Sequence, residues 1–164
     1  MRYFQTGTVW KKKESARESA IVEALDLKDL LHQGQPCVLA TIDPTGVPYT
    51  TFVSWVTAHN KNTICLALDA RGTALRNLQH TPGVALEILA PDRIVGIRGI
   101  ARIHRGRIAA CPFPSVIVTI NVIENRDHTG RGIVWQGPSY RYAKGKEHRY
   151  AVERAVLDEL EAKA

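Results

Sequence analysis

The residues best suited to binding an anion lie close together in the middle of the chain: Arg71, Gly72, Thr73 and Arg76. Gly72 allows a ligand to approach the backbone, and the start of a helix offers free amide groups and the positive end of its dipole. Thr73 adds a hydroxyl donor, and the arginines add charge-assisted hydrogen bonds. These groups could together bind an anion. An ordinary capped surface helix with solvated arginines fits the same residues, so taken singly they leave both interpretations open.

Nucleophilic and metal chemistry have no comparable pattern in the sequence. The six histidines show no ligand spacing, and no Ser/His/Asp arrangement can be argued from their neighbours. Cys37, Cys65 and Cys111 are widely separated and form no CxxC pair, so we expect reduced, packed thiols and no zinc site. The sequence therefore predicts no metal ligand and identifies no catalytic side chain.

Most elements that position these residues are predicted to be strands. Their apolar and β-branched patterns predict helices over 21–31, around 74–78 and over 144–164, and strands over 37–42, 47–56, 63–68, 84–89, 93–105 and 116–123, with a further short one over 132–136. Gly99 indicates a bulge. Six antiparallel strands joined mostly by hairpins, as in a meander, predict a mainly β fold, a small β-barrel with flanking helices. An OB-fold has nearly the same strand count.

Length and composition indicate one globular domain. We expect a basic leader over 1–20 and a single barrel domain over 21–164 that ends in a closing helix. No apolar run approaches the roughly 18 residues of a membrane helix, and the N-terminus lacks the layout of a signal peptide. We therefore expect a cytoplasmic protein that does not insert into membranes. The net charge of +6 favours anionic ligands without choosing among them.

Three stretches together resemble a known family: 36–49 with its LATxDxxGxP hairpin, 71–82 with RNLxxxP, and 84–88. With a GxAR motif at 99–102, they resemble the pyridoxamine 5′-phosphate oxidase-like, FMN-binding split-barrel family over about residues 25–105. The resemblance implies a six-stranded antiparallel split β-barrel of the FMN-binding type. It also implies a homodimer with the flavin in a groove between two barrels.

The resemblance further implies which residues bind the cofactor. In the family one strand runs along the flavin, where backbone amides and small polar groups orient the ring, and the segment 69–78 corresponds to the phosphate-binding turn and helix. Trp135 and Arg141 are similar, at a different spacing, to the tryptophan and arginine that complete the site. The implied cofactor-binding residues are Thr51, Val53, Ser54, Trp55, Arg71, Gly72, Thr73, Arg76, Trp135 and Arg141.

Three positions depart from the family pattern. Thr51 occupies the position of an arginine in the oxidases proper, Ala74 that of a phosphate-binding lysine, and Ile94 that of a glutamine that contacts the ring. Pyridoxamine phosphate oxidase activity itself is therefore not expected. The leading hypothesis is an FMN-dependent oxidoreductase for an unknown small molecule.

Two other classes of function remain open. One is a non-catalytic module that binds or senses a flavin, a deazaflavin or haem, which the missing lysine favours. The other is a basic OB-like nucleic-acid binder, which the net charge favours. Because the barrel face lacks a run of stacking aromatic residues, binding to nucleic acid is not expected.

Overall fold

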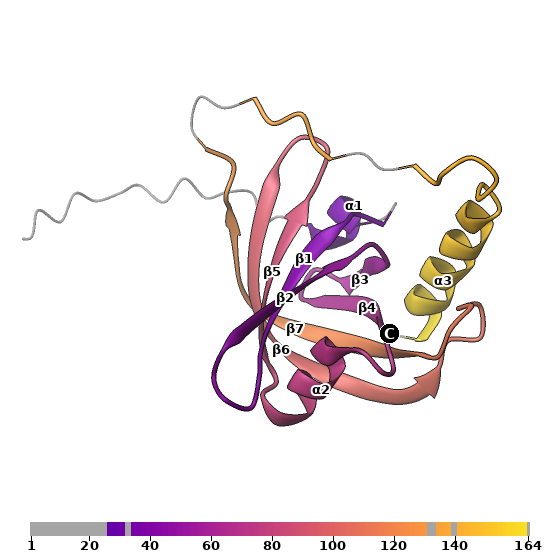
Figure 1. Ribbon diagram of the computed structural model, residues 1–164. Helices are drawn as coiled ribbons and strands as arrows, with labels where there is room; N and C mark the ends of the chain where they lie inside the picture. Colours follow the sequence, from indigo (N-terminus) through magenta and orange to yellow (C-terminus); the bar gives the residue numbers. More distant parts are fainter. Residues whose placement is uncertain (1–25, 32–33, 131–133, 139–140, 164) are drawn as a thin grey trace, which may run out of the picture.

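The computed structural model describes residues 26–31, 34–130, 134–138 and 141–163, without the side chains of 105, 106 and 163 (Figure 1). The leader expected over 1–20 lies outside these ranges. In chain order the elements are α1 (Leu27–Leu31), β1 (Cys37–Ile42), β2 (Pro48–Val53), β3 (Val56–Asn60), β4 (Thr63–Asp69), α2 (Thr73–His80), β5 (Gly83–Leu89), β6 (Ile94–Arg107), β7 (Ser115–Asp127) and α3 (Arg149–Lys163). No helix in these ranges is long and apolar enough to cross a membrane.

The described strands form one antiparallel sheet in the order β2-β1-β5-β6-β7-β4-β3. Strands β2 and β3 are its two edges, although only Ser54 and Trp55 separate them along the chain. Three Cα steps span about 11 Å at most. The sheet must therefore curl until its edges approach, and Figure 1 shows this curvature. Because β2 and β3 do not pair, the barrel is split along this line, which confirms the mainly β, split-barrel prediction.

The number of strands and the simple meander were predicted wrongly. The strand expected over 47–56 is two strands, because the chain leaves one edge of the sheet after Val53 and joins the other at Val56. Both valines are buried, so the apolar pattern runs through the break without marking it. Strand β1 pairs with β5 as well as β2, and β4 pairs with β7. Residues 134–136 form no strand, and 132–133 lie outside the described ranges.

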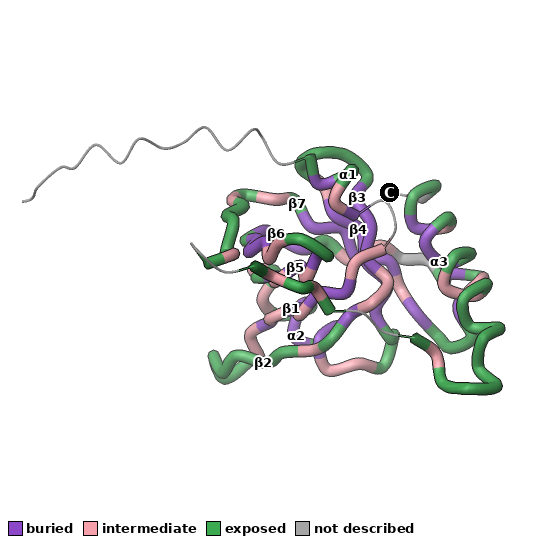
Figure 2. The backbone as a smooth tube through the Cα atoms, turned by 90° about the horizontal axis from the view of Figure 1, so that it is seen from above, coloured by how far each residue is buried: buried purple, intermediate pink, exposed green. Residues whose placement is uncertain are grey.

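Two apolar clusters hold the elements together. The larger cluster fills the barrel and includes Leu39, Leu86, Ile97 and Ile120. The smaller lies between the outer side of the sheet and α3, and contains Val156, Leu157 and Leu160 from the helix. Buried residues accordingly follow the strands and one side of α3 in Figure 2. The three cysteines are free and buried in these clusters, as predicted: Cys37 in the larger, Cys65 and Cys111 in the smaller.

Helix α2 is fixed to the barrel through one side. Its buried residues, Ala74, Leu75, Asn77 and Leu78, recur at helical spacing, which gives an inward-facing stripe. The Asn77 amide donates a hydrogen bond of 3.0 Å to Oγ1 of Thr41 on β1. The helix ends before Pro82, since proline lacks the N–H that a continued helix needs. The start of α2 is thereby held next to the end of β4.

Candidate ligand-binding groove

A groove with a volume of about 410 Å³ lies where β2, the end of β4 and the start of α2 meet. Ligand pockets commonly have volumes of about 300–1,000 Å³. The groove lies where the barrel is split, because the Ser54–Trp55 connection lines it. It brings together six of the ten residues implied by the resemblance: Thr51, Val53, Ser54, Trp55, Gly72 and Thr73.

Aromatic side chains form one wall of the groove. The ring of Trp55 stacks on that of Phe113, with centroids 5.5 Å apart and an angle of 12° between the planes. The Trp55 carbonyl accepts a hydrogen bond of 3.1 Å from the Ala67 amide on β4, which holds the backbone in place. Tyr142 also lines the groove; burial raises its pKa, and the nearby Glu153 raises it further. The wall therefore offers a flat apolar surface beside a phenol that stays protonated near neutral pH.

The start of α2 forms the other end of the groove. Gly72 is the N-cap residue, with φ −69° and ψ 152°, and no side chain caps the helix. A Cβ at this position would lie 3.1 Å from the Asp69 carbonyl oxygen, so glycine suits this tight turn. Gly72, Thr73, Ala74 and Leu75 all line the groove. The amide groups of the first turn are thus placed at an opening where an anion would meet the positive end of the helix dipole.

The two arginines of this segment do not line the groove. The guanidinium of Arg76 donates to Oγ1 of Thr73 and to the carbonyl oxygen of Arg71, both at 2.7 Å. Arg71 has a side chain that is 76% exposed, with Nε 3.8 Å from a carboxylate oxygen of Asp69. That Arg71 and Arg76 bind the phosphate of the cofactor remains a prediction. Ala74, at the position of the family's lysine, is buried and adds no charge.

Comparison with known proteins places this geometry in a family. The family model for pyridoxamine 5′-phosphate oxidase matches residues 26–111, which include β2, β4 and α2. The chain belongs to this family. No curated protein sequence matches it.

Solved structures share the fold at low identity. An F420 reductase is 20% identical, with 60% of this chain and 94% of that chain covered and a TM-score of 0.53. HupZ of Group A Streptococcus is 16% identical, with 62% and 90% covered and a TM-score of 0.54. HutZ of Vibrio cholerae, described as a haem storage protein, is 12% identical, with 61% and 90% covered and a TM-score of 0.51. Proteins of this fold thus include an oxidoreductase and a haem-storage protein.

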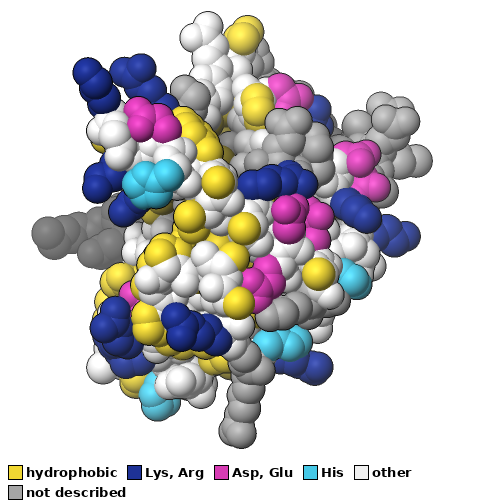
Figure 3. Space-filling model, turned by 90° about the vertical axis from the view of Figure 1, so that its right-hand side faces the viewer, with side chains coloured by type: hydrophobic (Ala, Val, Ile, Leu, Met, Phe, Trp, Pro, Cys, Tyr) yellow, Lys and Arg dark blue, Asp and Glu magenta, His cyan; other side chains and the backbone are white. Residues whose placement is uncertain are grey.

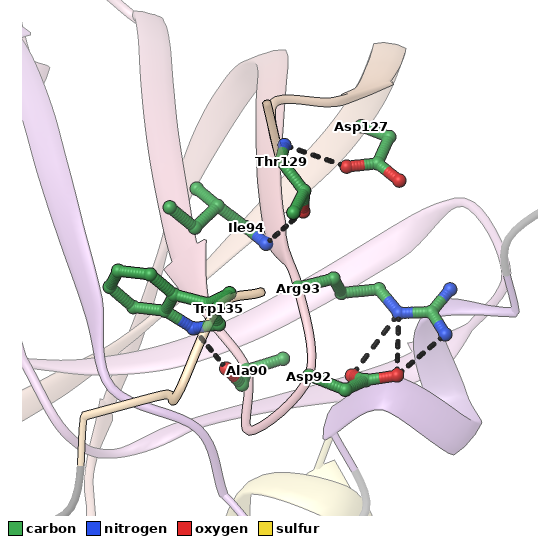
Figure 4. Close-up of polar contacts among 7 residues, drawn as sticks. All are labelled: Ala90, Asp92, Arg93, Ile94, Asp127, Thr129 and Trp135. Atoms are coloured by element: carbon green, nitrogen blue, oxygen red, sulfur yellow. Dashed lines mark hydrogen bonds and ion pairs between the residues drawn. The ribbon is translucent and has the colours of Figure 1, made fainter. Parts of the chain in front are cut away.

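Trp135 lies apart from the groove of its own chain. Its indole N–H donates a hydrogen bond of 2.8 Å to the Ala90 carbonyl, as Figure 4 shows. The Gly137 amide donates to the Pro91 carbonyl, and the Ile94 amide donates to Oγ1 of Thr129. Residues 134–138 of the chain are thus hydrogen-bonded to the β5–β6 turn.

Arg141 lines a neighbouring pocket with Tyr142, which also lines the groove, and Tyr150. The structure does not bring Arg141 or Trp135 to the groove within one chain. Their cofactor contacts therefore remain a prediction.

Among the groove residues that were not identified from the sequence are Tyr49, Phe113, Tyr142 and Arg149. Tyr49 directly follows the LATxDxxGxP motif, so the motif was a signal that could have identified it. The other three come from the β6–β7 connection and the C-terminal part, where neither spacing nor resemblance marks them. Among the described residues, no group of three or more His, Cys, Asp or Glu side chains could hold a metal ion.

Proposed function

We propose that the protein binds FMN in this groove and acts as an oxidoreductase on a small molecule, as a homodimer. The observation that carries the proposal is the groove itself: a stacked aromatic pair lies at one wall and an uncapped helix start at the other end. FMN combines a planar ring system with a terminal phosphate. In this proposal the aromatic wall matches the ring system of FMN, and the start of α2 matches its phosphate.

The residues of the groove fit FMN in kind. Trp55 offers its ring, and Thr51 and Ser54 offer hydroxyl groups beside β2. Gly72 and Thr73 offer amide groups to the phosphate, and Gly72 adds no side chain to obstruct it. When bound, FMN supplies the hydride or electron transfer.

The side chains of the groove orient the ligands and limit the access of water. The Trp55–Phe113 stack closes the aromatic wall. Tyr142, whose pKa is raised mainly by burial and then by the nearby Glu153, keeps its proton at neutral pH. In this proposal the substrate lies against the aromatic wall, beside this phenol.

The outer face of the sheet supports the homodimer. A hollow of about 430 Å³ on this face has small residues such as Val38, Ala40, Ala85 and Gly96 in its lining, together with the charged side chains of Glu87, Arg98, Glu124 and Arg126 and with His128. Phe52, which is 61% exposed, lines the groove from β2, the strand paired with β1 beside the hollow. A second copy seated on this face would cover the apolar surface and reach the groove.

A second candidate is non-catalytic binding of a flavin, a deazaflavin or haem, and the uncharged Ala74 favours it. Against haem, the described lining of the groove contains no histidine, cysteine or methionine, and of the two tyrosines that could serve as axial ligands, Tyr49 and Tyr142, the second has a raised pKa that disfavours the phenolate. The groove therefore favours a flavin-like ligand.

The visible absorption spectrum of the purified protein, before and after titration with FMN, tests the proposal. We expect two flavin bands and quenching of flavin fluorescence. A strong Soret band would identify the ligand as haem instead of FMN. If the protein binds no flavin, the proposal is refuted. With FMN bound, bleaching of the flavin bands by a nicotinamide nucleotide would support an oxidoreductase; a flavin that no reductant in such a panel bleaches would favour the binding module.

A further inference from the structure

The groove is nearly free of charged side chains. Among its described lining residues only Asp69 and Arg149 carry a charge. One carboxylate oxygen of Asp69 already accepts the Arg71 amide at 2.8 Å and faces the Arg71 guanidinium. Arg149 is therefore the one cation of the described lining. Figure 3 shows the side of the molecule that carries α3, where apolar surface lies between charged side chains of both signs.

No cation comes from α2 itself. Ala74 is buried and uncharged. The guanidinium of Arg76 is engaged by Thr73 and by the Arg71 carbonyl. Helix α2 thus presents amide groups to the groove without a full positive charge.

The fold fixes the position of Arg149. It is the first residue of α3, and its amide donates a hydrogen bond of 3.0 Å to the Lys146 carbonyl. Val156 and Leu160 of the same helix are fully buried against the sheet. Arg149 takes part in none of the ion pairs found among the described residues. The start of α3 therefore presents at the groove a guanidinium that belongs to none of these ion pairs and whose charge acts on the Tyr142 phenol.

We propose that Arg149 binds the terminal phosphate of the ligand in the groove, so that the C-terminal helix supplies the cation that α2 lacks. A planar guanidinium can donate two parallel hydrogen bonds to a phosphate and carries a full positive charge. Backbone amides and hydroxyl groups donate hydrogen bonds but carry no such charge. The inference rests on the proposed function, since it takes FMN as the ligand. It assigns a binding role to a residue outside the region that matches the family.

The test compares FMN with riboflavin, which lacks the phosphate. Both are titrated against the full-length wild type, Arg149→Ala, Arg149→Lys and a control, Arg154→Ala, with flavin fluorescence as the readout. Arg154 lies on the same helix and pairs with Asp158 at 2.9 Å, so its loss removes an equal charge away from the groove. Circular dichroism verifies that each variant is folded.

We expect Arg149→Ala to weaken FMN binding by roughly ten- to a hundredfold and to leave riboflavin binding unchanged. The FMN affinity of Arg149→Lys should fall between those of the wild type and Arg149→Ala, because lysine keeps the charge but loses the bidentate geometry. Arg154→Ala should bind both flavins as the wild type does.

Three results would overturn the inference. If Arg149→Ala and Arg154→Ala bind FMN equally well, Arg149 does not bind the phosphate, and the proposed function stands. If Arg149→Ala weakens both flavins to the same degree, the residue is structural. If the wild type binds neither flavin, the proposed function fails and the inference fails with it.

Discussion

Asn77 is a buried amide on α2, and its hydrogen bond to Thr41 is the polar link between that helix and β1. Asn77→Ala leaves the Thr41 hydroxyl without this donor and also removes packed atoms. We expect a loss of about 1–3 kcal/mol in the free energy of unfolding. Urea denaturation measures it, with Gln79→Ala, exposed on the same helix, as the control.

The pair can be separated from packing by a double-mutant cycle. If the hydrogen bond matters, Asn77→Ala and Thr41→Val together should cost less than the sum of the single changes. Strict additivity would show that the amide and hydroxyl do not interact energetically.

The groove was predictable from the sequence only where local chemistry marks it. Gly72 and Thr73 stand out because a glycine before a helix start is typical of an anion site. Trp55 was identified through the family resemblance alone. Arg149 is 76 residues further along the chain than Thr73, and only tertiary packing brings both to one groove.

The β1–β2 turn is built around one carboxylate. Asp43 Oδ1 accepts hydrogen bonds from the Thr45 hydroxyl at 2.7 Å, the Val47 amide at 2.9 Å and the Thr45 amide at 2.8 Å. These bonds, with that of the Thr45 side chain foremost, lower the pKa of Asp43 from 3.8. A lowered pKa means that the ionised form stabilises the fold above the unfolded-state value, and that this stability is lost as the pH falls through the folded-state value.

Asp43→Asn keeps the shape of the side chain but removes its titration. We expect the wild type to melt at a higher temperature than the variant at pH 7, and the difference to shrink below pH 3.8. Thermal melting from pH 7 to pH 2 measures it. A difference that stays constant over this range would contradict the role of the charge.

Gly99 marks a close approach between strands. The register between β6 and β7 shifts at Arg98/Gly99, which confirms the predicted bulge. A Cβ on Gly99 would lie 2.6 Å from the backbone oxygen of Asn121. Gly99→Ala should therefore destabilise the protein by about 1–3 kcal/mol.

Gly83 on β5 is the matched control for this change. A Cβ there meets nothing within 4 Å. Gly83→Ala should be neutral or stabilise by up to about 1 kcal/mol. Equal effects of the two substitutions in urea denaturation would refute the steric explanation.

The elements themselves followed well from local patterns, whereas their connections did not. The runs 37–42, 63–68 and 84–89 match β1, β4 and β5 to within one residue at each end, because turns or proline bound them. The crossing at Ser54–Trp55 carries no glycine or proline. It is set by closure of the sheet, which no local window contains.

At the scale of the whole molecule, the proposed dimer makes the hollow on β1, β5 and β6 an interface. Ala85 lines this hollow and is exposed in the single chain. Ala85→Arg would replace a small side chain of the hollow by a long, charged one, beside Glu87 and Arg98, which also line it. Ala151, exposed on α3, allows the same substitution on a different surface.

Light scattering should give the wild type twice the chain mass of 18.2 kDa. We expect Ala85→Arg to shift the protein towards the monomer and Ala151→Arg to leave it dimeric, because burying an unpaired charge in an interface is costly. If a second copy completes the groove, the monomeric variant should also bind FMN more weakly, although Ala85 does not line the groove. If the wild type is monomeric at micromolar concentration, the proposed dimer is refuted. If Ala85→Arg remains dimeric, the interface lies on another face. If a monomeric variant binds FMN as tightly as the wild type, each chain forms its groove alone.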